Sequence, residues 1–127
     1  MRCFVKMKAI YLIRVATVVV IVFAIYAYFN RLPGKFYFTR FDELMHITGF
    51  TVISFVVKLS FPSSSSIMLI FWLCMAGLLV EVMQPLLTVG RELSCYDVMA
   101  NWVGVSLGVM IVATIIRLIS IMKSPLR

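Results

Sequence analysis

Residues 67–89 read IMLIFWLCMAGLLVEVMQPLLTV, an apolar run that a single charged side chain, Glu81, interrupts. An apolar stretch of about 20 residues is long enough to cross the hydrocarbon core of a bilayer as an α-helix. Three further apolar stretches lie at about 9–29, 42–61 and 97–121. None of them alternates polar and apolar residues as the strands of a membrane barrel do. The sequence therefore predicts an all-α polytopic membrane protein, a compact antiparallel bundle of four transmembrane helices in a single domain over 1–127.

The composition fits this class. Of the 127 residues, 63% are apolar and 13% are charged, whereas a soluble domain carries about a quarter charged residues. A chain of this length has too little interior to bury the excess apolar surface. The composition leaves no room for a soluble catalytic domain, and the net charge of +7 is expected to serve topology and contacts with anionic lipid headgroups rather than nucleic acid.

The basic residues also predict the orientation. In a four-span protein the two termini and the turn after 42–61 share one side of the membrane. That side would hold Arg2, Lys6, Lys8, Arg14, Lys58, Arg117, Lys123 and Arg127. The other side would hold Arg31, Lys35, Arg40 and Arg91. Since cytoplasmic loops carry the excess of Lys and Arg, both termini are predicted to be cytoplasmic. The stretch 9–29 is interpreted as an uncleaved span, because it is long for a signal peptide.

Acidic residues fall at one level of the predicted bundle. Asp42 opens the second span, Glu81 lies late in the third, and Asp97 opens the fourth. In an antiparallel bundle these positions approach the same, outer, membrane surface. Ionisable side chains within a membrane segment face the bundle interior and mark functional sites by default. The three helices are therefore expected to bring their carboxylates together.

Polar and small residues continue each of these faces. His46 lies four residues after Asp42, Gln84 three residues after Glu81, and Asn101 four residues after Asp97. Residues at these spacings share one face of a helix. Gly104 and Gly108 extend the Asn101 face as a Gly-x-x-x-Gly pair, a pattern that lets a neighbouring helix approach closely. We expect these two glycines to pack inside the bundle.

Three motifs appear in order on the second, third and fourth spans. They are Asp42-Glu43-x-x-His46-x-x-x-Phe50, Glu81-x-x-Gln84, and Arg91-x-x-Ser94-x-x-Asp97-x-x-x-Asn101-x-x-Gly104. Together they cover about half of the chain and resemble the signature of the VanZ-like membrane protein family. Glu43 is a departure, since the family more often has lysine at that position. The family takes its name from a protein associated with resistance to the glycopeptide antibiotic teicoplanin, and its members are small proteins of the bacterial inner membrane.

The resemblance implies a bacterial cell-envelope protein of the cytoplasmic membrane, with a polar site that opens toward the outside. The first hypothesis is that the site binds a lipid headgroup or a lipid-linked cell-wall intermediate, with a link to teicoplanin resistance. Its partners would be the bilayer, such an envelope precursor or another envelope protein. The ligand-binding candidates are Asp42, His46, Glu81, Gln84, Arg91, Asp97 and Asn101. Arg91 would hold a phosphate by charge-assisted hydrogen bonds.

Two alternatives remain open. The first is a metal-dependent membrane enzyme that acts on a lipid phosphate. Asp42, His46, Glu81 and Asp97 would then hold a hard divalent ion, and His46 or Glu81 would be the general base. The second is a structural or accessory protein, in which the same residues form an interhelical hydrogen-bond network. The sequence carries no diagnostic catalytic motif, so it implies no certain cofactor, and a divalent metal is the candidate.

Overall fold

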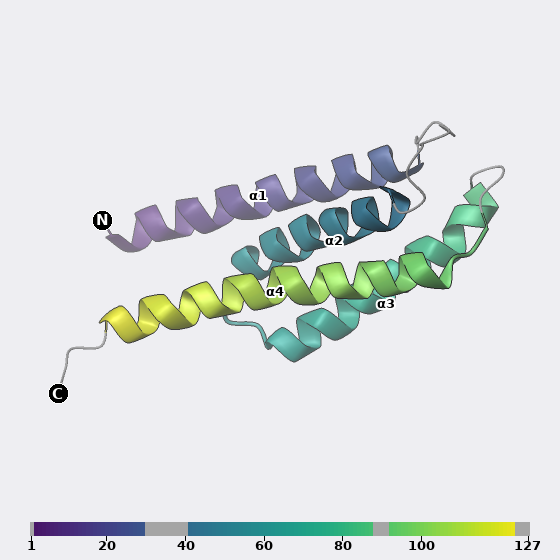
Figure 1. Ribbon diagram of the computed structural model, residues 1–127. Helices are drawn as coiled ribbons and strands as arrows, with labels where there is room; N and C mark the ends of the chain where they lie inside the picture. The colour runs from purple at the N-terminus through teal and green to yellow at the C-terminus, as the bar shows by residue number, and fades with distance from the viewer. Residues whose placement is uncertain (1, 30–40, 88–91, 124–127) are drawn as a thin grey trace.

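The computed structural model describes the backbone of residues 2–29, 41–87 and 92–123, and the side chains of 10–26, 41–87 and 92–123. These residues form four helices, α1 (Arg2–Phe29), α2 (Phe41–Ser60), α3 (Ser66–Leu87) and α4 (Cys95–Lys123). The described ranges contain no strand. The prediction of an all-α, four-helix fold is therefore confirmed. Figure 1 shows that successive helices run in opposite directions, so the start of α1 and the end of α4 lie at the same end.

The helix boundaries follow the apolar stretches closely at α2, α3 and α4. α1 differs, because it begins at Arg2 rather than near Ala9. The residues in between include Arg2, Lys6 and Lys8, and the segment holds neither Gly nor Pro, so it suits a helix although it is basic. α3 continues through Pro85 to Leu87, and the end predicted at Val89 lies outside the described residues.

Three helices are long and apolar enough to cross a membrane, namely α2, α3 and α4. In α1 the described apolar stretch is Ile10–Tyr26. By length and composition, the structure therefore provides three candidate membrane spans and a shorter apolar helical stretch.

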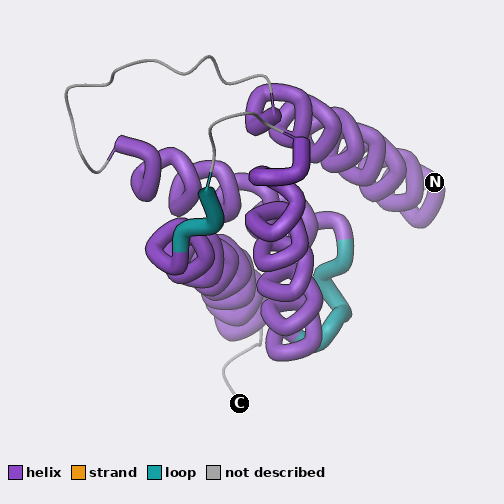
Figure 2. The backbone as a smooth tube through the Cα atoms, turned by 90° about the vertical axis from the view of Figure 1, so that its right-hand side faces the viewer, coloured by secondary structure: helices purple, strands orange, loops and turns teal. Residues whose placement is uncertain are grey.

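α2 and α4 form the central pair of the fold. They make the most extensive contact between any two helices, while α3 packs mainly on α4 and α1 mainly on α2. Figure 2 views the bundle from another side, with α1 at its edge. The Thr17 hydroxyl ties α1 to α2 through a hydrogen bond of 2.6 Å with the Ser60 hydroxyl. The Trp102 indole N–H of α4 donates to the Cys74 carbonyl of α3 at 3.3 Å.

The interior of the described bundle is unusually polar. Its buried polar and charged side chains are Thr17, His46, Ser54, Lys58, Ser60, Glu81, Gln84, Asp97 and Asn101. The buried apolar side chains are Phe50, Val98, Ala100, Val105, Val109 and Val112. Large apolar side chains are instead on the outside: Ile67, Leu86 and Met122 are 81%, 74% and 83% exposed. This distribution is the reverse of that in a soluble domain.

The buried lysine lies at the end of α2 that leads into the turn. The ammonium of Lys58 donates to the Pro62 carbonyl at 3.2 Å and to the Ser64 carbonyl. The Arg14 guanidinium of α1 lies over the ring of Phe61, 5.0 Å from its centroid. Cationic side chains of α1 and α2 therefore contact the turn between α2 and α3, at the end of the bundle where the sequence predicts most of the basic residues.

Two glycines bring the backbones of α2 and α4 together. A methyl group added at Gly104 would collide with the Ile47 carbonyl, and one added at Gly108 would collide with the Ser54 hydroxyl and the Thr51 carbonyl. The Ser54 hydroxyl also lies 3.4 Å from the Gly104 carbonyl, to which it donates. Both glycines therefore face α2 within the bundle, and any larger side chain would separate the two central helices.

We expect Gly108→Ala to lower the free energy of unfolding by about 1–3 kcal/mol, the usual cost of overpacking a close contact. Gly49→Ala is the matched control, because nothing lies within 4 Å of a methyl group added there. Since Ala is the better helix former, that variant should be as stable as the wild type or more stable by up to about 1 kcal/mol. Thermal unfolding of the purified variants, followed by circular dichroism, measures both. Equal stability of the two variants would contradict this packing.

Candidate functional site

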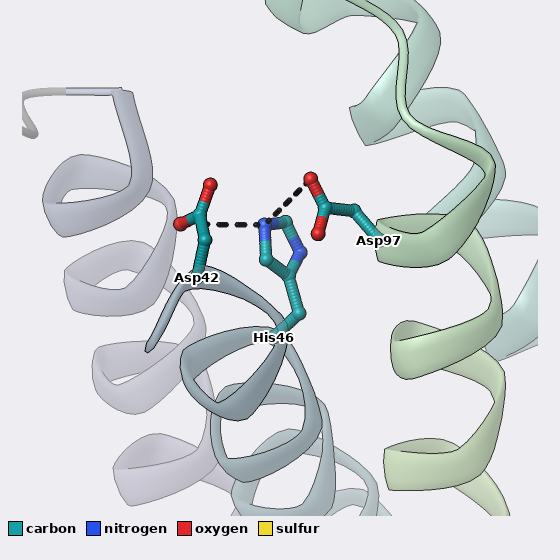
Figure 3. A group of neighbouring side chains, drawn as sticks. All are labelled: Asp42, His46 and Asp97. Atoms are coloured by element: carbon teal, nitrogen blue, oxygen red, sulfur yellow. Dashed lines mark ion pairs between the residues drawn. The ribbon is translucent and has the colours of Figure 1, made fainter. Parts of the chain in front are cut away.

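The fold brings five of the predicted site residues together at one end of the bundle. We call this region the site end: the N-terminal turns of α2 and α4 and the C-terminal half of α3. α2 supplies Asp42 and His46, α4 supplies Asp97 and Asn101, and α3 supplies Glu81. Figure 3 shows the side chains of Asp42 and Asp97 pointing from their two helices toward the ring of His46.

The start of α4 fixes the position of Asp97. Ser94 precedes the helix, and its hydroxyl accepts a hydrogen bond from the Asp97 backbone N–H at 3.3 Å. The Ser94 carbonyl accepts the next one, from the Val98 N–H at 3.1 Å. Ser is a favoured residue at this capping position, and a carboxylate in the first turn is stabilised by the helix dipole. The carboxylate of Asp97 then extends toward α2 instead of returning to the cap.

A hydrogen bond between the central helices sets the orientation of His46. Its Nδ1 atom lies 2.9 Å from Asn101 Oδ1. An amide oxygen only accepts, so Nδ1 carries the proton and donates it. The Asn101 amide nitrogen, on its other side, donates to the Gly77 carbonyl at 3.4 Å. This second bond fixes which end of the amide faces the imidazole, and with it the tautomer of the ring.

Two carboxylates flank the other nitrogen of the ring. His46 Nε2 lies 3.8 Å from Asp97 Oδ2 and 4.0 Å from Asp42 Oδ1 (Figure 3). These separations are within ion-pair distance but longer than a direct hydrogen bond. The Nε2 side of the imidazole therefore faces two carboxylate groups, one from each central helix.

Glu81 lies on the Nδ1 side of the same ring. Its Oε2 atom is 4.0 Å from His46 Nδ1, and both side chains are 0% exposed. Glu81 is also the residue whose main-chain carbonyl would receive the helical hydrogen bond from position 85. Pro85 has no N–H to donate there, so the helical ladder of α3 is interrupted beside the site.

Exposure across the site changes in one direction. The side chain of Asp42 is 38% exposed, that of Asp97 is 8% exposed, and that of His46 is 0% exposed. The cluster is thus closed toward the middle of the bundle and accessible beside Asp42.

Of the remaining predicted residues, Gln84, Gly104 and Gly108 make none of these side-chain contacts. Gln84 is 1% exposed, and its Oε1 atom has no hydrogen-bond partner among the described residues. Arg91 lies outside the described residues, so its predicted role as a phosphate-binding group stays a prediction. Gly104 and Gly108 lie deeper, against α2.

Sequence reasoning missed the contribution of Gly77. Its carbonyl accepts from Asn101, and a methyl group added at Gly77 would lie 3.1 Å from the Phe50 ring and 3.2 Å from Asn101 Cβ. Gly77 lies four residues before Glu81, on the same face of the helix. That spacing is the signal that could have identified it.

The arrangement offers a set of metal ligands. Asp42, His46 and Asp97 each present one ligand atom, and these atoms all lie within 4.8 Å of one another. Glu81, which the sequence placed in the same ligand set, approaches the protonated nitrogen of the ring instead. Among the described residues, the metal-ligand group is therefore made by two helices, α2 and α4.

Comparison with known proteins adds no relative. No family model matches the chain, and no curated protein or solved structure is significantly similar to it.

We expect Asn101→Ala to lower the free energy of unfolding by about 1–3 kcal/mol, because the buried Nδ1–H of His46 would lose its acceptor. Ser106→Ala on the same helix is the control. The Ser106 hydroxyl donates to the Trp102 carbonyl within its own helix, so this change should stay within about 0.5 kcal/mol of the wild type. Chemical or thermal unfolding in one detergent compares the two, and an Asn101→Ala variant as stable as Ser106→Ala would contradict the assigned hydrogen bond.

Proposed function

We propose that the chain is a VanZ-like, four-span protein of the bacterial cytoplasmic membrane that binds the polar head of an envelope lipid or lipid-linked cell-wall intermediate. The observation that carries the proposal is the cluster of Asp42, His46, Asp97 and Asn101, buried at one end of an apolar bundle and accessible beside Asp42. A site in this position meets the headgroup region while the exposed apolar faces of the bundle meet the acyl or prenyl chains.

Membrane insertion is supported by the distribution of side chains. The described helices expose large apolar residues and bury polar ones. Lipid solvates the first group, and polar side chains in a bilayer face the bundle interior. α2, α3 and α4 have the length and hydropathy of membrane spans. We assign α1 as the fourth span, with its apolar stretch Ile10–Tyr26 inside a longer helix.

The orientation follows from the basic residues. We call the end of the bundle that carries the turn between α2 and α3 the turn end. Arg14 and Lys58 contact this turn. The last part of α4, which holds Arg117 and Lys123, ends on the same side (Figure 1). The described acidic residues are at the site end or on α3 leading to it. By the positive-inside rule, the turn end faces the cytoplasm and the site end faces outward.

The nature of the ligand follows from the chemistry of the site. Carboxylate oxygens and an imidazole nitrogen bind divalent cations, and a headgroup at the outer surface presents phosphate oxygens that can share such a cation. The motif resemblance favours lipids of cell-wall synthesis, and through them a link to teicoplanin resistance. The acidic cluster repels a bare phosphate, so we expect binding to require divalent cations.

Cysteine labelling tests the proposed orientation. Cys95 is exposed at the start of α4. In intact cells, a membrane-impermeant maleimide should label a variant that keeps Cys95 alone. It should not label Ser65→Cys in a background in which Cys3, Cys74 and Cys95 are replaced by serine. Labelling at position 65 together with protection of Cys95 would reverse the topology.

Ligand-induced thermal stabilisation tests the proposed specificity. With divalent cations present, phosphatidic acid or a polyprenyl phosphate should raise the melting temperature of the purified protein by several degrees, because a ligand that binds only the folded state stabilises it. The controls are diacylglycerol and polyprenol with the same chains. Comparison of the two phosphates separates a glycerolipid from a wall-lipid ligand. Equal shifts with the phosphorylated and unphosphorylated lipids would refute headgroup binding.

A further inference from the structure

The side of His46 that faces Asp42 and Asp97 has the properties of a metal-ligand position. Since Nδ1 donates its proton to Asn101, Nε2 is the ring nitrogen that can offer a lone pair to an ion. A histidine that binds a metal typically donates its other ring N–H to a protein oxygen in this way, which fixes both tautomer and orientation. The Asn101 amide is itself held by the Gly77 carbonyl. The ring is therefore oriented before any ion arrives.

The spacing of the three ligand atoms suits one ion. Donors bound to a common ion at about 2.0–2.2 Å lie roughly 3.0–3.5 Å from one another. Here Nε2 lies 3.8 Å from Asp97 Oδ2 and 4.0 Å from Asp42 Oδ1. Small rotations of the two carboxylates would close the set around an ion. The side chain of Asp42 is partly exposed.

α3 carries a buried oxygen that has no partner among the described residues. Glu81 and Gln84 are buried on the face of α3 that packs toward the other helices. Glu81 is level with His46, and Gln84 lies one turn closer to the site end than Glu81. In the same way, Asp42 lies one turn closer to that end than His46, and Asp97 one turn closer than Asn101. Gln84 Oε1 is buried without a hydrogen-bond partner in the described part of the chain. Buried amide oxygens are nearly always satisfied, so this atom is available to an ion or to a water molecule bound to it.

We infer that Asp42, His46 and Asp97 hold one divalent cation, with Asn101 as the residue that positions His46. Two carboxylate oxygens and one imidazole nitrogen suit Mn²⁺, Fe²⁺ or Zn²⁺. Three protein ligands leave coordination positions open, and the exposure of Asp42 puts them at the accessible side of the cluster. This inference rests on the proposed function, because it makes a phosphate oxygen of the lipid headgroup the occupant of those positions.

Charge balance explains why the ion is needed. Two carboxylates in a largely buried site repel a phosphate, whereas a bound divalent cation cancels their charge. The cation then attracts the phosphate as a further oxygen ligand. The metal-free protein would bind phosphorylated lipid weakly, and the metal-loaded protein would bind it well.

Titration of the lipid-free protein in detergent with Mn²⁺ alone tests the metal site. The six-line electron paramagnetic resonance signal of free Mn²⁺ reports the unbound ion, and pulsed spectra report ¹⁴N coupling from a bound imidazole. We expect one Mn²⁺ per chain, with ¹⁴N coupling. Loss of an outer partner of a ligand typically costs about 10–100-fold in metal affinity, so Asp42→Asn and Asp97→Asn, which remove ligands, should lose at least that much. Glu92→Gln removes one charge near the start of α4 without removing a ligand, and should bind Mn²⁺ as the wild type does.

Asn101 has a separate test. Asn101→Ala should weaken Mn²⁺ binding by about 10–100-fold, and Asn101→Asp, which keeps an oxygen acceptor for Nδ1–H, should restore most of the affinity. Circular dichroism and gel filtration identify the variants that fold. Asp42→Asn, at a partly exposed position, keeps the test decisive if the buried variants do not fold.

Three results would overturn the inference: no Mn²⁺ binding at millimolar concentration, binding without ¹⁴N coupling, or full affinity in both aspartate variants. The lipid assay, repeated after EDTA treatment, separates this failure from that of the proposed function. Mn²⁺ binding without any lipid-induced shift would support the metal site and refute the headgroup ligand. A lipid-induced shift that persists in EDTA would support the headgroup ligand and refute the cation as its mediator.

Discussion

The hydrogen bond from His46 to Asn101 joins the two central helices of the fold. It forms one turn from the point where Gly104 brings α4 against the Ile47 carbonyl of α2. The absence of a side chain at Gly104 is what lets the two backbones come close enough for so short a connection. Once the imidazole is held on one nitrogen, its other nitrogen faces the carboxylates that begin α2 and α4. The close approach of α2 and α4 thus accounts both for the packing at Gly104 and for the position of the polar cluster.

A network built for stability alone is a poor explanation of this cluster. Interhelical hydrogen bonds in membranes contribute only about 0.6 kcal/mol each on average. Removing a carboxylate from water costs several kcal/mol unless the group is paired or neutralised. Asp97 is only 8% exposed, and its separation from His46 exceeds that of a direct hydrogen bond. The bond between His46 and Asn101 is well formed, in contrast, and fits a structural role that supports the two aspartates.

The sequence predicted the architecture well, because the apolar stretches and the turn at Pro62 leave few alternatives. It also predicted that Asp42, Glu81 and Asp97 approach one end of the bundle, because the antiparallel order of the helices alone determines the height of each residue along the bundle axis. It did not predict the roles within the cluster. The Gly77 carbonyl and the rotation of three helices about their axes determine which partner each ring nitrogen of His46 faces. The spacing of residues along one helix predicts neither the carbonyl contact nor the rotation. The apolar pattern predicts a span near 9–29 but not the helical turns that precede it from Arg2, because charged residues lie outside an apolar stretch although they also form helices readily.

The most direct test of a ligand site against a structural network is the thermal stability of Asp97→Asn in metal-free detergent, compared with the wild type and with Glu92→Gln. Functional sites commonly lower stability, so a ligand site predicts that Asp97→Asn melts at the same temperature as the wild type or higher. The amide keeps the shape of the side chain and removes its charge. A melting temperature several degrees below both the wild type and Glu92→Gln would contradict a ligand site and identify the carboxylate as part of the framework that holds α2 to α4.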